Sequence, residues 1–177
     1  MRLPIDNHRD ENSAEHSWSL ALLAGALAKK IDPTLDIGRV CQLAVVHDLL
    51  EVYAGDTSIW DEQKISSKKA REAKAVKKIE ASFAEFPWII AMIKEYEAQK
   101  TPEAKFVNAV DKYLAIAVRY ISEQSGGKFY KDKKVTREMY RKGVERSRQK
   151  VKSHPGLIEP FEEVLEKSLN SDWFYKL

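Results

Sequence analysis

The residues with the means to do chemistry are concentrated in one short apolar stretch. Residues 45–51 read VVHDLLE, and a further acid, Asp56, follows just after a glycine. Burying a carboxylate is costly unless it is paired or ligated to a metal ion. On a helix, Glu51 lies four positions after His47 and three after Asp48, so these side chains converge on one face. Imidazole and carboxylate together suit a divalent metal ion.

A histidine and an adjacent aspartate cannot hold an ion alone, so further ligands must come from other helices. His16 lies near the start of the first expected helix, and Asp111 lies in an apolar stripe of a later one. Each also has an ordinary explanation: His16 as a hydrogen-bonded core histidine, Asp111 as the partner of a core arginine, and Glu51 as a surface acid. Taken with His47 and Asp48, however, they favour a metal site.

The hydrophobic pattern predicts an all-α protein of six or seven helices. Apolar residues recur every four positions over Ser13–Lys30, with Asn12 or Ser13 as the cap, and a second helix is expected from about Asp36 to Ala54. The second helix is apolar on nearly all sides, so we expect it to be buried. Further helices are expected over residues 66–86, 88–99, 101–125, 136–150 and 156–169.

Composition narrows the class of protein. The 177 residues include 44% hydrophobic and 32% charged side chains, which indicates one globular domain over residues 1–177. The single cysteine, Cys41, excludes a disulfide framework and a Cys-rich zinc module. The longest apolar stretch, Leu20–Ala28, is less than half of the ~20 residues that a membrane span needs. We therefore expect a cytoplasmic protein without a membrane partner.

Charge and aromatic residues leave two questions about partners open. Residues 128–152 carry eleven Lys or Arg against three acids, which suggests either a phosphate-rich partner or an ordinary solvated helix face. A nucleic-acid partner is the less favoured of the two. Trp88, Trp173, Phe174 and Tyr175 suggest either a homodimer interface or ordinary core and tail packing.

The sequence resembles a known family at three places. The strings ENSAEHSW at 11–18 and HDLLE at 47–51, followed by Asp56 and later by Asp111, are similar to the HD-domain metal-dependent phosphohydrolases. The branch that they resemble includes bacterial 5′-deoxynucleotidases. The resemblance covers about residues 2–124 and implies an all-α HD domain, with C-terminal helices over 134–170 appended.

The resemblance also implies roles for residues of the site. It implies a nucleoside monophosphate substrate and one divalent metal ion, with Glu51 and Asp56 acting near the attacking water and the leaving oxygen. The metal ligands that it implies are His16, His47, Asp48 and Asp111. In that branch a helix before the first motif supplies a phosphate-binding arginine, but only 15 residues precede His16 here. Arg2 and Arg9 are the available candidates, and the spacing of Arg2 does not match cleanly.

Such a site suits phosphate ester hydrolysis. A bound ion lowers the pKa of water and neutralises charge on a phosphoryl oxygen, and Mn, Co, Fe, Zn or Mg can fill this role. We expect a phosphohydrolase that removes the 5′-phosphate of nucleoside or deoxynucleoside monophosphates. The alternatives are hydrolysis of a nucleoside triphosphate, an alarmone or a cyclic dinucleotide, or a non-catalytic nucleotide- or nucleic-acid-binding regulator.

Overall fold

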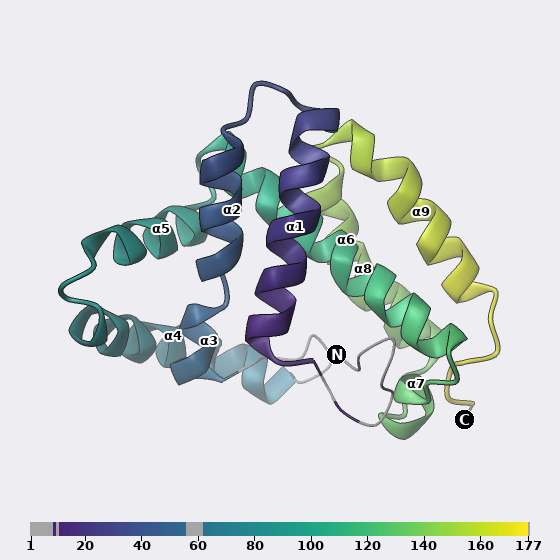
Figure 1. Cartoon of the computed structure of the whole chain (residues 1–177). Helices are drawn as coiled ribbons and strands as arrows, with labels where there is room; N and C mark the ends of the chain where they lie inside the picture. Colours follow the sequence, from purple (N-terminus) through teal and green to yellow (C-terminus); the bar gives the residue numbers. More distant parts are fainter. Residues whose placement is uncertain (1–8, 10, 56–61, 177) are drawn as a thin grey trace. The chain divides into compact units, whose positions relative to one another are not determined.

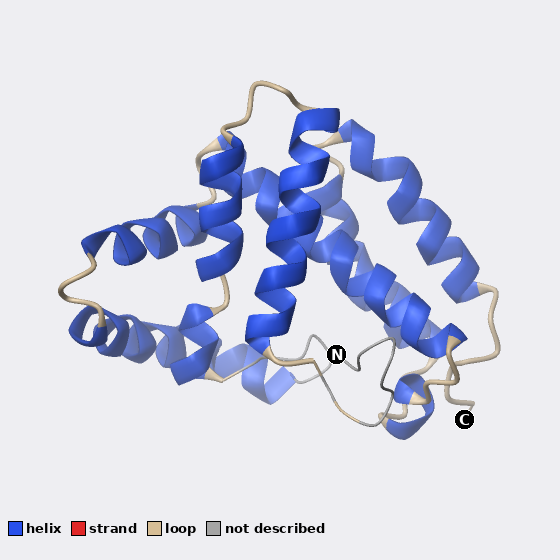
Figure 2. Ribbon diagram, in the orientation of Figure 1, coloured by secondary structure: helices blue, strands red, loops and turns tan. Residues whose placement is uncertain are grey.

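A computed structural model describes residues 9, 11–55 and 62–176, and all regular structure in that part of the chain is helical (Figures 1 and 2). Seven of the described helices have ten or more residues, and α3 and α7 are short. The predicted all-α class is therefore confirmed. The elements are α1 (Ser13–Ile31), α2 (Ile37–Val46), α3 (Leu49–Ala54), α4 (Glu62–Ser82), α5 (Pro87–Ala98), α6 (Pro102–Gln124), α7 (Phe129–Asp132), α8 (Arg137–Val151) and α9 (Pro155–Leu169).

The chain divides into two compact units. The N-terminal unit comprises His16–Val107, and the C-terminal unit comprises Asn108–Leu177 together with Met1–Glu15. A single domain over the whole chain therefore stays a prediction. Among the described residues, none of the helices combines the length and hydropathy that a membrane crossing needs.

In the N-terminal unit, α1 and α2 lie side by side because small residues let them approach closely (Figure 1). A Cβ on Gly25 would meet the Cys41 sulfur at 3.0 Å, so a larger residue at this crossing would require the Cys41 side chain to shift. Asp36 starts α2, since its side chain accepts a hydrogen bond from the Arg39 backbone N–H at 3.0 Å. These contacts hold α2 in place, and the HD dipeptide follows directly after its last residue.

The predicted continuous helix from Asp36 to Ala54 is wrong, because the chain breaks at the HD dipeptide. Helix α2 ends at Val46 and α3 begins at Leu49. Asp48 has φ −92° and ψ 0°, outside the helical range, and its carbonyl accepts the Glu51 N–H at 2.9 Å in a tighter three-residue turn. Burial on all sides is also wrong, since Val45 is 52% exposed.

Helices α3, α4 and α5 complete the N-terminal unit. The predicted 66–86 helix begins earlier, at Glu62, and ends at Ser82. Its inward face includes Ala75 and Ile79, and α5 buries Met92 and Ile93. Helix α5 ends where Gln99 takes the left-handed conformation (φ 49°), so that the chain can turn into α6.

We expect Ile79→Ala to lower the free energy of unfolding by about 2–5 kcal/mol, because it removes a buried aliphatic side chain from α4. Ile79 is only 2% exposed. Val52→Ala on α3 is the matched control, since Val52 is 65% exposed and its loss should change stability by no more than ~0.5 kcal/mol. Urea denaturation followed by circular dichroism measures both. Equal effects of the two substitutions would contradict the packing described for α4.

An aromatic cluster forms the core at the end of the C-terminal unit. The Phe174 ring lies 4.9 Å from the ring of Tyr130 and 5.2 Å from that of Tyr140, centroid to centroid. The Tyr175 N–H donates to the Val135 carbonyl at 3.0 Å, which holds the C-terminal tail beside the start of α8. Phe174 is thus a buried core residue, as tail packing predicted, whereas Trp88 of the other unit is 50% exposed. The homodimer stays a prediction.

The basic segment 128–152 covers α7 and α8, and some of its charges are already paired. Arg148 donates to both carboxylate oxygens of Glu162 on α9, at 2.7 and 2.8 Å, and Lys142 pairs with Glu138 at 2.8 Å. These contacts join α8 to α9 and stabilise the surface of α8. They agree with the solvated-face interpretation and leave a phosphate-rich partner untested.

Candidate metal centre

Three of the predicted metal ligands lie together in the N-terminal unit. Single ligand atoms of His16, His47 and Asp48 all lie within 4.8 Å of one another, a spacing at which they could hold one metal ion. His16 comes from the first turns of α1, while His47 ends α2 and Asp48 precedes α3. The break between α2 and α3 thus places both residues of the HD dipeptide in the same group as His16.

The His47 imidazole is held in the orientation that a metal ligand requires. Its Nδ1 lies 2.7 Å from the Ala44 carbonyl oxygen, which can only accept, so Nδ1 carries the hydrogen. In a neutral imidazole with this hydrogen, Nε2 is the nitrogen that carries the lone pair, as in metal-binding histidines whose other nitrogen donates to a carbonyl. The ring is nearly buried, with 3% of the side chain exposed.

Asp48 completes the case for a cation. Its Oδ1 lies 3.0 Å from His47 Nε2, and 20% of its side chain is exposed. A neutral imidazole nitrogen and a carboxylate oxygen are both electron-pair donors, so this approach is favourable only with a proton or a cation shared between them. The His16 ring, 5.3 Å from the His47 ring, adds a further nitrogen donor. These residues therefore fit a divalent ion.

A comparison with protein families identifies the chain. The HD domain family model matches residues 2–152, which is most of the sequence. The chain belongs to the HD domain family. The resemblance noted in the sequence is thereby confirmed. The histidine–aspartate dipeptide at 47–48 lies within the matched residues and is one of the motifs on which that resemblance was based.

Relatives of this HD domain protein include proteins named as 5′-deoxynucleotidases. It is 29% identical to the 5′-deoxynucleotidase hdd1 of Schizosaccharomyces pombe, over 66% of this chain and 60% of that one. It is 32% identical to the human 5′-deoxynucleotidase HDDC2, over 58% of this chain and 50% of that one. The chain thus spans about half to three-fifths of the length of these relatives.

A solved structure resembles this HD domain protein over nearly its whole length. It is the crystal structure of a predicted metal-dependent phosphohydrolase from Magnetospirillum magnetotacticum MS-1. The TM-score is 0.79 and the identity 27%, covering 99% of this chain and 88% of that one. The likeness extends the shared architecture beyond the residues that carry the HD motifs.

The other predicted site residues lie elsewhere in the structure or outside the described residues. Glu51 lies on the first turn of α3, half-buried and outside the group of His16, His47 and Asp48. Asp111, on α6 in the C-terminal unit, is 7% exposed, and its Oδ2 accepts from Lys112 Nζ at 2.5 Å. Lys112 is thus one partner of Asp111, and the role of Asp111 as a ligand stays a prediction. Asp56 and Arg2 lie outside the described residues.

Arg9, the other candidate for binding phosphate, forms a two-pronged ion pair with Glu15. The distances are 2.9 Å from Nη1 to Oε2 and 2.5 Å from Nη2 to Oε1. The hydrogen bond from Arg9, together with one from the Asn12 backbone, lowers the pKa of Glu15 to about 2. Asn12 caps α1 and Glu15 returns a bond to its N–H at 3.1 Å, which is a capping box. The guanidinium is thus already engaged with an acid.

Two contacts that the sequence did not predict support the region around α3. Arg71, on α4, donates through Nη1 to the carbonyls of Ala54 and, at 3.1 Å, Gly55. These bonds satisfy backbone carbonyls at the end of α3. The other contact is the ring of Tyr96 against His47, at 5.5 Å between centroids. Neither an arginine nor a tyrosine on an amphipathic helix carries a sequence signal for such a contact.

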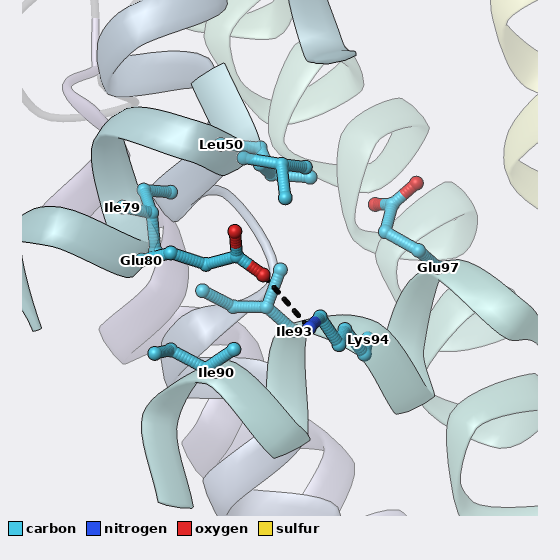
Figure 3. A pocket seen from close by; sticks show the side chains of 8 residues that line it. Leu50, Ile79, Glu80, Ile90, Ile93, Lys94 and Glu97 are labelled. Carbon is cyan, nitrogen blue, oxygen red and sulfur yellow. Dashed lines mark hydrogen bonds and ion pairs between the residues drawn. The ribbon is translucent and has the colours of Figure 1, made fainter. Parts of the chain in front are cut away.

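An apolar cavity of about 150 Å³ lies beside α3 and is separate from the metal group (Figure 3). The ion pair of Glu80 with Lys94, 2.8 Å long, spans one side of it. It shares no residue with the predicted site, so it does not identify the reaction centre. Its lining residues are Leu50, Val76, Ile79, Glu80, Ile90, Ile93, Lys94 and Glu97.

Proposed function

We propose that this protein is a divalent-metal-dependent phosphohydrolase that removes the 5′-phosphate of nucleoside or deoxynucleoside monophosphates. The observation that carries the proposal is the group of His16, His47 and Asp48, whose donors suit one divalent ion. Two similarities support it: the curated relatives are named 5′-deoxynucleotidases, and the similar solved structure is described as a metal-dependent phosphohydrolase. The chain spans only part of those relatives, so their activity supports the proposal without establishing it.

The residues that would hold the ion are His16, His47 and Asp48, with Asp111 as the fourth ligand that the resemblance to the family implies. When bound, the ion supplies Lewis-acid chemistry to the phosphoryl group and acidifies the attacking water. The bond from His47 Nδ1 to the Ala44 carbonyl places the hydrogen of a neutral imidazole on Nδ1, so that Nε2 is the nitrogen that would bind the ion. The single negative charge of Asp48 offsets part of the charge of the ion.

Two carboxyl groups divide the proton transfers in the proposed reaction. Glu51 orients the attacking water and accepts its proton as the new P–O bond forms. The bond from phosphorus to the 5′ oxygen breaks, and Asp56 gives a proton to that leaving oxygen. Asp56 must therefore start protonated, and the proton that Glu51 has taken from water returns to Asp56 through solvent after turnover. The products are inorganic phosphate and a nucleoside, so atoms and charge balance without a further reactant.

Release of inorganic phosphate from a nucleotide panel tests the function directly. We expect metal-stripped protein to be inactive and added Mn, Co, Fe, Zn or Mg to restore hydrolysis of one or more 5′-monophosphates. Comparing ribose with deoxyribose substrates defines the sugar preference. Activity confined to nucleoside triphosphates, alarmones or cyclic dinucleotides would overturn the monophosphate assignment. Failure of every ion to bind at one per chain would overturn the metal site itself.

Arg9 is the described candidate for holding the substrate phosphate, with Arg2 as the alternative. Its guanidinium is paired with Glu15, which therefore competes with a phosphate for its N–H donors. Because the pKa of Glu15 is about 2, the competing carboxylate is ionised at every pH above about 4. The competition therefore does not change with pH in the neutral range.

We expect substitutions at 9 and 15 to move KM in opposite directions. Arg9→Ala should raise KM for a monophosphate about tenfold or more, because a charge-assisted two-pronged contact is lost. Glu15→Gln should lower KM, because it removes the competing charge while keeping a side chain able to bond the Asn12 N–H through its amide oxygen. Steady-state kinetics at neutral pH measures both. An unchanged KM in both variants would assign phosphate binding to another group.

A further inference from the structure

We propose that Tyr96 is a positioning residue for the metal centre: its ring, held by a fixed turn of α5, keeps the His47 imidazole aligned for metal binding. The inference rests on the proposed centre of His16, His47 and Asp48. It concerns a residue that takes no part in the proposed proton transfers and that the HD motifs do not include.

The contact between the two rings is direct and has a defined geometry. The ring centroids of Tyr96 and His47 lie 5.5 Å apart at an interplanar angle of 71°, which is an edge-to-face arrangement. Such pairs are favourable at centroid distances of 4.5–7 Å because the edge of one ring carries partial positive charge and the face of the other negative charge. The arrangement therefore prefers one orientation of the imidazole rather than merely filling space.

The turn of α5 that carries Tyr96 is held from two directions. The neighbouring Glu95 accepts hydrogen bonds from Arg39 on α2 and from the Thr101 hydroxyl, the latter at 2.7 Å. Although burial raises the pKa of Glu95, these bonds outweigh it and lower the pKa overall. The Tyr96 carbonyl also accepts from both the backbone and the side chain of Gln99, at 3.2 and 2.5 Å. The backbone at Tyr96 is thus anchored before its ring meets His47.

His47 needs such support because it lies between two helices. It follows the last residue of α2 and precedes Asp48, whose backbone leaves the helical conformation. The Ala44 carbonyl fixes one edge of the imidazole through Nδ1, at 2.7 Å. A hydrogen bond at one edge still allows the ring to tilt about that edge. Contact with Tyr96 limits the tilt and so keeps Nε2 directed at Asp48 Oδ1.

Cobalt binding to the metal-stripped full chain tests the inference without measuring catalysis. Co²⁺ is titrated into wild type, Tyr96→Met, Tyr96→Leu and Tyr96→Phe, with affinity from calorimetry and ligand geometry from the visible absorption bands. We expect the Met and Leu variants to bind Co²⁺ about 10-fold more weakly, within the 10–100-fold range for loss of a group that orients a ligand, and to shift the bands. The Phe variant keeps the ring and should stay within about twofold of wild type.

Tyr120→Leu is the matched control, since Tyr120 is also half-buried and makes an edge-to-face contact, with Trp173 in the C-terminal unit at 5.5 Å. It should leave Co²⁺ affinity and spectrum unchanged. Circular dichroism shows which variants are folded, and one folded variant of the two, Tyr96→Met or Tyr96→Leu, is enough for the test. If a folded Tyr96→Met or Tyr96→Leu variant has wild-type Co²⁺ affinity and spectrum, the role of Tyr96 is overturned while the metal centre stands. The same conclusion follows if Tyr96→Phe loses as much Co²⁺ affinity as Tyr96→Leu. No Co²⁺ binding by wild type would overturn the proposed metal centre as well.

Discussion

Asp48→Ala is expected to abolish both metal binding and phosphate release. Asp48 is the only carboxylate in the group of three donors, and its Oδ1 lies 3.0 Å from His47 Nε2. Without it, this group offers the ion only two neutral imidazoles, and of the proposed ligands Asp111 alone is left to supply negative charge. The loss of affinity should exceed the roughly 10–100-fold that removing an outer partner costs. Mn²⁺ and Co²⁺ titration of stripped protein, together with phosphate release, measure the effect.

The fold should survive this substitution. Asp48 precedes α3, but its side chain makes no capping hydrogen bond to that helix, so alanine removes no cap. Asp132→Ala, at an exposed acid of α7, is the control and should leave metal affinity unchanged. A folded Asp48→Ala protein that binds metal and turns over substrate like wild type would remove Asp48 from the proposed ligands.

Glu51→Ala is expected to separate metal binding from turnover. Glu51 lies outside the group of three donors, so the affinity for metal and for substrate should stay largely intact. Removing a group that orients or deprotonates the attacking water costs ~10²–10⁴-fold in rate. Phosphate release at saturating substrate measures the rate, and calorimetry with a nucleoside monophosphate measures the retained binding. The metal-loaded variant should also hold its substrate long enough for crystallisation.

Other outcomes at Glu51 would reassign the roles of the acids. Glu85→Ala is the matched control, because Glu85 is an exposed acid of the same unit, and its rate should equal that of wild type. If Glu51→Ala loses the metal while Asp111→Ala keeps it, the assignments of ligand and base are reversed. If Glu51→Ala retains nearly full turnover, Glu51 is a structural acid and another group activates the water.

The fold class could be predicted from the sequence because it depends on local patterns. Apolar residues at intervals of three and four, few glycines and prolines, and caps such as Asn12 and Thr136 act over neighbouring turns. The same is true of the metal residues: the HD dipeptide and the Glu-His pair at 15–16 stand in short strings whose family resemblance the HD domain match confirmed. The sequence thus determined the fold class, the family and the candidate ligands.

The arrangement at the HD dipeptide was decided only by tertiary structure. Every residue from 45 to 51 is compatible with a helix, so the pattern predicted one that continues through His47 and Asp48. Where a helix stops inside such a stretch depends on packing with other elements, and here α3 packs against α4 while α2 packs against α5.

The partners of charged and aromatic side chains were likewise invisible in the sequence. Arg39 and Glu95 are 56 positions apart, and Tyr96 lies 49 positions after His47. Their contacts depend on how α5 lies against α2, which no local propensity encodes. Local periodicity specified which residues face a core, whereas distances between helices decided which donors meet, because a long-range contact forms only once the intervening chain has folded.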